Sequence, residues 1–245
     1  MKSSEPVTTP GGERRRSLRA APCCAMALAA TAGLMPAAAE AHVETTEVWT
    51  DVGVRVVPLR RLRLTFTQNV RFSTMYGLRR IIPELEADYR VIGPLRIGGG
   101  YRYLWRDGAL GDVEEGHLIH GDVMVQLRPL RHLDIELRSR VQWRSVGKDK
   151  NGFLWDETRD TWRNRVNVEW TFRSPFTVNA FVEHWARFDD TLRHDRFRVG
   201  AGISAEVSRW RFQLFYMRDM PDFIDNPNVN MVGLSARLEL DLTHR

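Results

Sequence analysis

The feature that most constrains this chain is an alternation of apolar and polar residues with a period of two. The stretch RLRLTFTQNVRF, residues 61–72, places mainly leucine, phenylalanine and valine at one set of alternate positions and mainly arginine, threonine and asparagine at the other. Successive side chains of a strand point to opposite faces, so this stretch predicts a strand with one apolar and one polar face. A soluble protein buries the apolar face, whereas a barrel in a lipid bilayer exposes it.

Eleven segments of this kind follow one another, and no helical period of 3.6 residues lies between them. Each segment has the length and the alternation of a single strand. The segments cover residues 47–57, 61–72, 80–92, 95–106, 114–128, 131–145, 161–172, 176–188, 194–207, 209–218 and 229–242.

The connectors between these segments alternate in length. VPLR, IGP, RPLR, RSP and the chain around Ser208 are tight turns, and the connectors between them are longer and polar: STMYGL, RDGALGDVEEG, SVGKDKNGFLWDETRD, DDTLRH and RDMPDFIDNPN. Short turns at one end and longer loops at the other are typical of outer-membrane barrels, with the turns in the periplasm.

In each segment the apolar residues occupy one set of alternate positions, which we name the apolar phase, and the polar and charged residues occupy the other, the charged phase. The composition of the apolar phase favours contact with lipid. It carries essentially no charge in its middle, and an arginine or lysine there would cost about 2 to 4 kcal/mol at the bilayer midplane. Its aromatic residues, such as Trp49, Tyr101, Trp143 and Trp210, lie mostly near segment ends, where interfacial belts form. The sequence therefore predicts an all-β fold, a transmembrane up-and-down antiparallel β-barrel of about ten to twelve strands.

The amino end predicts export. Lys2 and four arginines precede the apolar run CCAMALAATAGLMP, which is followed by AAAEAH. This order is that of a secretory signal, with cleavage expected after Ala41. We therefore expect residues 1–41 to be a cleaved signal peptide, residues 42–245 to form the barrel, and the protein to reside in the outer membrane of a Gram-negative cell envelope.

Loss of the signal changes the composition of the chain. Cys23 and Cys24 leave with it, so no disulfide, thiolate nucleophile or cysteine metal site remains. The signal carries five of the 36 Lys and Arg residues and three of the 31 acids, which leaves 31 basic and 28 acidic residues. This near balance argues against a nucleic-acid partner despite a sequence pI of about 9.6.

Several strand patterns occur in a recognisable order: EVWTDVGVRVV, LRLTFTQNVRF, GGGYRYLW, RSRVQWR and RNRVNVEW. Together with the signal they resemble the uncharacterised bacterial outer-membrane β-barrel family named domain of unknown function 2490. The resemblance covers nearly the whole chain after the signal. It implies the barrel architecture, and it implies no activity, ligand or catalytic residue.

The strand count raises a difficulty, because bacterial single-chain barrels are normally even. Ten strands close with the carboxyl end in the periplasm, but segment 47–57 then begins at the outer end. A loop hides a twelfth strand, the first segment is misplaced, or the amino end threads or plugs the lumen.

Function is expected in the barrel interior, where the charged phase points. Arginines and acids there form either a plug of ion pairs or a narrow polar path that favours small anions, since arginines exceed acids. The expected lining is Arg63, Arg71, Glu84, Glu86, Asp88, Arg102, Asp122, Glu136, Arg138, Arg140, Arg163, Arg165, Glu169, Glu183, Arg196 and Arg198. The expected partners are outer-membrane lipid, the barrel assembly machinery and a small polar or anionic solute.

The alternative is an outer-membrane hydrolase of lipid or peptide with a site on the barrel rim. No nucleophile motif or HExxH is present, so we expect no enzyme, no cofactor and no metal. His120 and Asp122 share a face and could form a hydrogen bond, whereas Glu183 and His184 point to opposite faces.

Two further sets of residues are interpreted as structural. The three glycines at 98–100 indicate a bend or close packing within a strand. Asp219, Asp222 and Asp225 could bind calcium, but solvated loop acids are the expected role.

Overall fold

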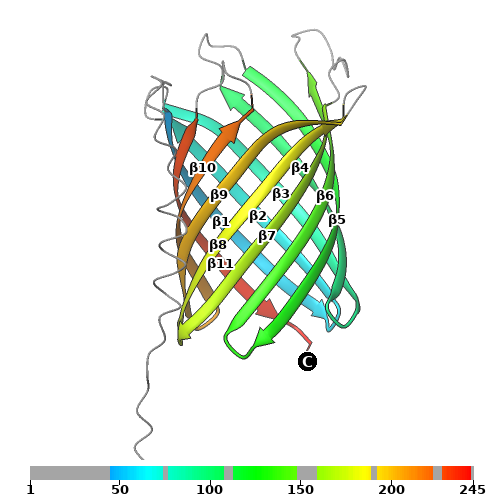
Figure 1. Cartoon of the computed structure of the whole chain (residues 1–245), viewed down its shortest axis with the longest axis vertical. Helices are drawn as coiled ribbons and strands as arrows, with labels where there is room; N and C mark the ends of the chain where they lie inside the picture. Colours follow the sequence, from blue (N-terminus) through cyan, green and yellow to red (C-terminus); the bar gives the residue numbers. More distant parts are fainter. Residues whose placement is uncertain are drawn as a thin grey trace, which may run out of the picture. The chain divides into compact units, whose positions relative to one another are not determined.

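The computed structural model describes residues 45–73, 77–107, 113–147, 159–188, 192–222 and 228–243. The predicted signal, residues 1–41, lies outside this range and stays a prediction. The described chain is almost entirely strand (Figure 1). Its eleven strands are β1 Thr45–Leu59, β2 Leu62–Ser73, β3 Gly77–Ile92, β4 Leu95–Asp107, β5 Val113–Leu130, β6 Leu133–Gly147, β7 Arg159–Arg173, β8 Phe176–Phe188, β9 Leu192–Val207, β10 Trp210–Pro221 and β11 Val229–Asp241.

The eleven strands form one closed barrel in sequence order. Every pair of consecutive strands is antiparallel, and the barrel closes where β1 meets β11. Because the first and last strands pair with each other, their backbone groups are hydrogen-bonded on both sides and no sheet edge remains open. The predicted all-β up-and-down barrel is thus confirmed.

The closing pair solves the difficulty of the odd strand count. β1 and β11 are parallel, in a continuous register from Thr45 opposite Val229 to Val57 opposite Asp241. The expectation of an entirely antiparallel barrel is wrong at this seam. So are the three explanations offered for the odd count, because the first segment is itself a wall strand with β2 on one side and β11 on the other.

The connectors differ between the two ends of the barrel. Two residues separate the strands at each of the five turns at one end, Arg60–Arg61, Gly93–Pro94, Arg131–His132, Ser174–Pro175 and Ser208–Arg209. Gly93 and Ser208 adopt positive φ angles of 40° and 57°, as tight hairpins require. The connectors at the other end are longer, up to the interval between β6 and β7. β11 ends at the short-turn end, at the bottom of Figure 1.

The two phases of the strands face opposite environments. Large apolar side chains are exposed on every strand, for example Val52 (58 %), Leu85 (56 %), Ile119 (58 %) and Leu234 (55 %). Charged residues of the other phase, such as Arg140 (3 %), are buried inside the barrel. The apolar phase therefore faces outward and the charged phase inward. The described residues contain no apolar helix long enough to cross a membrane.

On one side of the interior, apolar side chains replace the charged side chains that line the rest of the wall. We name the following five buried residues the inner apolar cluster: Trp49, Phe181, Phe215, Met217 and Met231. They come from β1, β8, β10 and β11, so they line the interior beside the parallel seam. The assignment of Trp49 to the outward apolar phase is wrong: its indole donates to Glu47 at 2.9 Å, and the Arg71 guanidinium stacks on it at 3.5 Å.

Glycines make room for the aromatic rings of this cluster. A Cβ at Gly233 would overlap the ring of Phe215, and a Cβ at Gly200 would lie 2.5 Å from the ring of Phe181. Because both glycines belong to the inward phase, each ring occupies the interior space that a side chain at the glycine would fill. The cluster therefore depends on residues without side chains opposite large ones.

Candidate functional site

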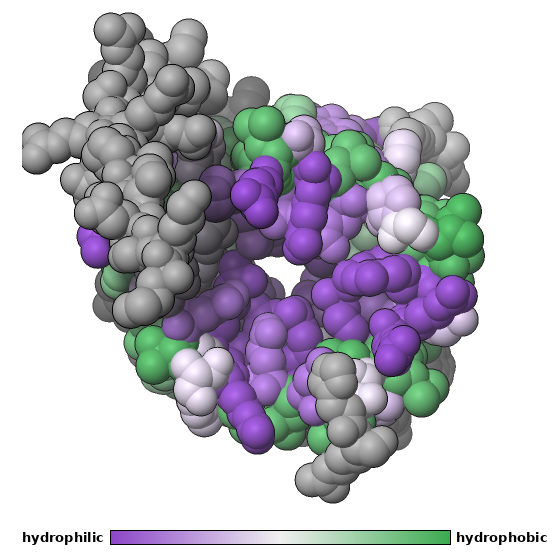
Figure 2. Space-filling model, turned by 90° about the horizontal axis from the view of Figure 1, so that it is seen from below, coloured by the Kyte–Doolittle hydropathy of each residue, from purple (hydrophilic) through white to green (hydrophobic). Residues whose placement is uncertain are grey.

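The barrel interior contains a cavity of about 840 Å³. Figure 2 views the barrel along its axis from the short-turn end and shows an opening at its centre, surrounded by hydrophilic side chains. At about 30 Å³ per liquid water molecule, this volume holds on the order of tens of waters. The interior is thus only partly filled by its own side chains, as expected for a barrel between eight and sixteen strands.

The structure places all sixteen charged residues that the sequence assigned to the interior on this lining. Thirteen further charged residues also line it, although sequence reasoning did not name them for the interior. They are Arg55, Arg80, Arg128, Arg144, Arg187, Arg211, Arg237, Glu47, Asp51, Asp134, Asp195, Glu206 and Asp219. The lining then holds sixteen arginines and thirteen acids, an excess of three positive charges.

Arg140 of β6 holds together the first of two charged groups in the interior. Its Nε and Nη2 donate to both oxygens of Asp122 at 2.5 and 2.8 Å, and Nη2 also donates to Glu86 at 2.6 Å. Its Nη1 lies 3.5 Å from Glu84, which accepts two hydrogen bonds of 2.6 Å from Arg102. We name this group the Arg140 network: Glu84, Glu86, Arg102, Asp122 and Arg140.

The glycines of β4 position this network. The ring of His120 lies over Gly100, where a Cβ would approach its Cε1 to 2.6 Å, and Asp88 lies similarly over Gly98. Side chains at these positions would stand between β3 and β5 on the interior surface. The interpretation of the three glycines as a place of close packing is confirmed, and it explains how acids of β3 reach Arg140 two strands beyond β4.

His120 and Asp122 lie on one face as expected, but the possible hydrogen bond between them is not formed, and neither ring nitrogen of His120 has a hydrogen-bond partner among the described residues. His120 Nε2 lies 3.5 Å from Asp122 and 3.3 Å from Glu86, with its side chain fully enclosed. Ligand atoms of His120, Glu84 and Glu86 lie within 4.8 Å of one another, close enough to hold a metal ion. Arg140 already provides the positive charge beside these carboxylates, so the network acts as an internal ion-pair group in which a cation would face a guanidinium.

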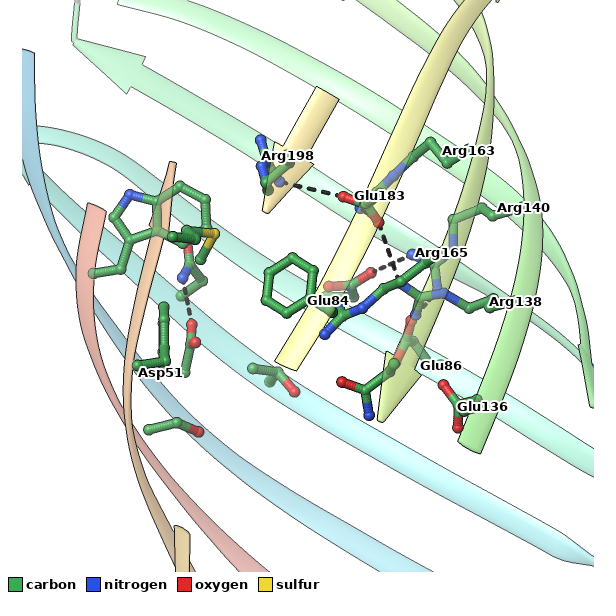
Figure 3. Close-up of a pocket in the computed structure, with 18 of the residues that line it drawn as sticks. Asp51, Glu84, Glu86, Glu136, Arg138, Arg140, Arg163, Arg165, Glu183 and Arg198 are labelled. Atoms are coloured by element: carbon green, nitrogen blue, oxygen red, sulfur yellow. Dashed lines mark hydrogen bonds and ion pairs between the residues drawn. The ribbon is translucent and has the colours of Figure 1, made fainter. Parts of the chain in front are cut away.

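Glu183 of β8 is the centre of the second charged group (Figure 3). Its side chain is 1 % exposed and accepts hydrogen bonds from Arg163 at 2.7 Å and from the Trp185 indole at 2.9 Å. Arg138 and Arg198 lie 3.7 and 3.6 Å from its oxygens. One carboxylate is therefore shared by three arginines.

A fourth arginine, Arg165, belongs to the same place. It lies directly opposite Arg138 in the pairing of β6 and β7, and Arg140 lies directly opposite Arg163. The guanidinium of Arg165 stacks on Phe181 at 3.9 Å, and within the described chain it has no carboxylate within 4.0 Å. We name this second group the Glu183 cluster: Arg138, Arg163, Arg165, Glu183 and Arg198.

Two other expectations concern residues near the loop end. Asp219 is not a solvated loop acid: it is buried on β10 and accepts hydrogen bonds from Arg198 at 2.8 Å and Arg196 at 3.3 Å. Asp222 is exposed, and Asp225 lies outside the described residues. A strand that extends to Pro221 carries Asp219 into the interior, which a pattern ending at residue 218 missed.

Glu183 and His184 do point to opposite faces. Glu183 lines the cavity, whereas His184 packs outside against His194, with 3.0 Å between ring nitrogens, and against Phe197. The outer histidines thus do not contribute to the charged interior.

The fold and the site define a class of protein, a closed eleven-stranded β-barrel with an apolar exterior and a charged, partly open interior. Residues 46–230 match the model of a family described as "Protein of unknown function (DUF2490)", and the chain belongs to this family. A comparison with curated proteins finds no match. The resemblance seen in the strand patterns is thereby confirmed at the level of the family.

Proposed function

We propose that the protein is an outer-membrane β-barrel whose lumen forms a narrow polar path for small solutes, with a preference for anions. The observation that carries the proposal is the combination of an apolar exterior with a charged cavity of about 840 Å³. Its surroundings are outer-membrane lipid, and barrel assembly machinery is the expected partner during insertion.

The exterior supports a lipid environment. Exposed apolar side chains on every strand make a continuous surface far beyond the few hundred Å² usual for a soluble monomer. Aromatic pairs flank the short turns, with ring centroids 6.2 Å apart for Phe172 and Phe176 and 6.1 Å apart for Trp210 and Phe212. At the opposite end, Trp143 of β6 (50 %) and Phe188, the last residue of β8 (42 %), are exposed. Aromatic residues near both ends match the two interfacial belts of membrane barrels.

The arrangement of the interior side chains favours an open path rather than a complete plug. Ion pairs hold the charged side chains against the wall, as in the bidentate pair of Arg140 and Asp122, and leave the central opening of Figure 2. Three more arginines than acids line this space, which raises the local concentration of anions in a low-dielectric tube.

The proposal does not include hydrolysis. The histidine nearest to carboxylates, His120, lies beside Glu86 and Asp122, and both acids accept hydrogen bonds from Arg140. Carboxylates held in this way act as partners of the arginine instead of activating a nucleophile.

Membrane location is tested by cell fractionation and by gel mobility. We expect the protein in the outer-membrane fraction, and we expect the folded protein in detergent to run faster before boiling than after. Recovery from the periplasm without detergent, with no change of mobility on boiling, would overturn the proposal.

The path is tested in planar bilayers. Purified protein should produce discrete conductance steps, and the reversal potential in a salt gradient should indicate preference for chloride over potassium. Arg138→Glu should move that potential toward cation preference, because it replaces a positive charge on the cavity lining by a negative one. A protein that inserts but stays silent at all voltages would identify a plugged barrel.

A further inference from the structure

The Glu183 cluster itself contains more positive than negative charge. Four guanidinium groups lie around one enclosed carboxylate, three of them within 4.0 Å of its oxygens, and among the described residues only Arg198 of the four has a second acid, Asp219 at 2.8 Å. Like charges directly opposite each other on neighbouring strands are destabilising. A folded barrel therefore retains here an arrangement that costs free energy in the absence of an additional anion.

The cost is concentrated at Arg138 and Arg165. Arg163 is bound by Glu183 and stacks on Trp185 at 3.9 Å. Among the described residues, by contrast, Arg165 contacts only the face of Phe181, and the one acid near Arg138 is Glu183, at a long 3.7 Å. Both side chains line the cavity, where a solute can reach them. Two guanidinium groups on adjacent strands thus retain donors for a ligand.

The neighbouring side chains hold these donors in place. Figure 3 shows Arg138, Arg163, Arg165 and Arg198 gathered around Glu183 at the cavity. Stacking on an aromatic ring and a shared carboxylate restrict the guanidinium planes before any ligand arrives. A pre-positioned pair of arginine forks suits the oxygens of a phosphate or carboxylate group, which they bind with short charge-assisted hydrogen bonds.

We propose that the Glu183 cluster binds a small oxyanion with two negative charges, such as a phosphate group, between Arg138 and Arg165. A dianion fits better than chloride because it offers several acceptor oxygens and reduces an excess of several positive charges. This inference rests on the proposed solvent-filled lumen and names the class of solute held there.

Binding is tested on the full chain folded in detergent micelles, with inorganic phosphate as the probe. The thermal unfolding midpoint, followed by tryptophan fluorescence, should rise with phosphate and saturate, whereas sodium chloride at equal ionic strength should give a smaller rise without saturation. Arg165→Gln should weaken the apparent affinity for phosphate at least about tenfold, the loss typical of a charged hydrogen bond. The apparent phosphate affinity of Arg165→Lys should lie between that of Arg165→Gln and that of the original protein. Lysine keeps the positive charge but lacks the two parallel N–H donors of the guanidinium group.

Arg55→Gln is the matched control. Arg55 also lines the cavity but pairs with Glu239 at 3.0 Å, so this variant removes the same charge from the lumen outside the cluster. We expect its phosphate affinity to stay within about twofold of the original protein. Equal losses in Arg55→Gln and Arg165→Gln, or equal effects of chloride and phosphate, would overturn the site in favour of general charge screening. If Arg165→Gln fails to fold, Arg138→Gln and Arg165→Lys replace it.

The assay separates this inference from the proposed path. If the barrel binds phosphate in micelles but never conducts in bilayers, the proposed phosphate site stands and the proposed solute path is overturned. A conducting barrel whose phosphate response does not saturate would retain the path and overturn the site.

Discussion

The interior walls of the barrel differ in how they are stabilised. Across β3 to β6, the Arg140 network joins carboxylates and guanidinium groups through hydrogen bonds as short as 2.5 Å. Across β8, β10, β11 and β1, the inner apolar cluster packs aromatic rings and methionines beside the parallel seam. The first wall is stabilised by ion pairs between oppositely charged side chains, and the second by close packing of apolar side chains.

This difference corresponds to how each wall is closed. Strands β3 to β6 are consecutive in the sequence and are joined by antiparallel pairing throughout. The seam of β1 and β11 is parallel, a slightly weaker pairing per residue, and its strands lie at opposite ends of the sequence. Apolar burial beside the seam adds a stabilisation that does not require precise charge pairing.

The largest expected effect comes from breaking the Arg140 network. Arg140→Gln leaves the buried Asp122 and the half-buried Glu86 beside a neutral side chain, and breaking the buried pair of Arg140 and Asp122 in this way costs about 3 to 5 kcal/mol. Urea titrations of the detergent-folded protein should show this loss. Arg128→Gln is the control, because Arg128 is 72 % exposed in its pair with Asp134 and should change the free energy of unfolding by less than about 1 kcal/mol. Similar losses in both variants would contradict a structural role of the network.

The second prediction breaks the inner apolar cluster. Phe215→Ala should cost about 3 kcal/mol, since it removes a ring that is 9 % exposed. Hydrogen exchange of backbone amides should then accelerate in β1 and β11 more than in β5 and β6. Phe212→Ala removes a ring from the outer face of the same strand and serves as the control. Uniform acceleration around the barrel would show that the cluster does not support the seam specifically.

The third prediction tests how tightly a glycine packs against an aromatic ring within the inner apolar cluster. Gly233→Ala places a methyl group against the ring of Phe215, and overpacking of this kind costs about 1 to 3 kcal/mol. Gly121→Ala is the matched control, since its Cβ would meet no atom within 4 Å and should change stability by no more than about 0.5 kcal/mol. Urea titrations compare the two, and equal values would mean that the ring moves freely away from Gly233.

The smallest expected effect separates the two charged groups. Arg165→Gln removes a guanidinium that lies opposite Arg138 and has no carboxylate of the described residues within 4.0 Å, so we expect a change below about 1 kcal/mol, in the stabilising direction, when phosphate is absent. The same substitution at Arg140 should instead destabilise the protein, by about 3 to 5 kcal/mol. Urea titration in phosphate-free buffer checks this, and a large loss at Arg165 would show that it stabilises the fold.

Much of the fold could be predicted because its signal is local. The interval 176–188 matches β8 in full, and 95–106 differs from β4 by one residue at its end. Alternation and turn residues act over a few neighbours, so they are visible in a single sequence. The parallel seam was missed because no local pattern shows which strand lies beside residues 45–59.

The interior residues could be predicted as a set, but their partners could not. Alternation assigns Arg140 and Glu86 to one face of the sheet, whereas their 2.6 Å contact joins residues 54 positions apart across β4 and β5. The inner apolar cluster was missed because Phe215 and Met217 are apolar residues in a charged phase. Gly200 and Gly233 in that phase were the signal that could have revealed it.

The sequence by itself determined that this protein is a barrel of strands with an apolar and a charged surface, because the period of two is a property of each strand alone. Only the tertiary structure decided the number of strands, the parallel closure, and which arginines have acids to neutralise them. These depend on curvature and stagger around the closed wall, which bring residues far apart in the chain within hydrogen-bonding distance of one another.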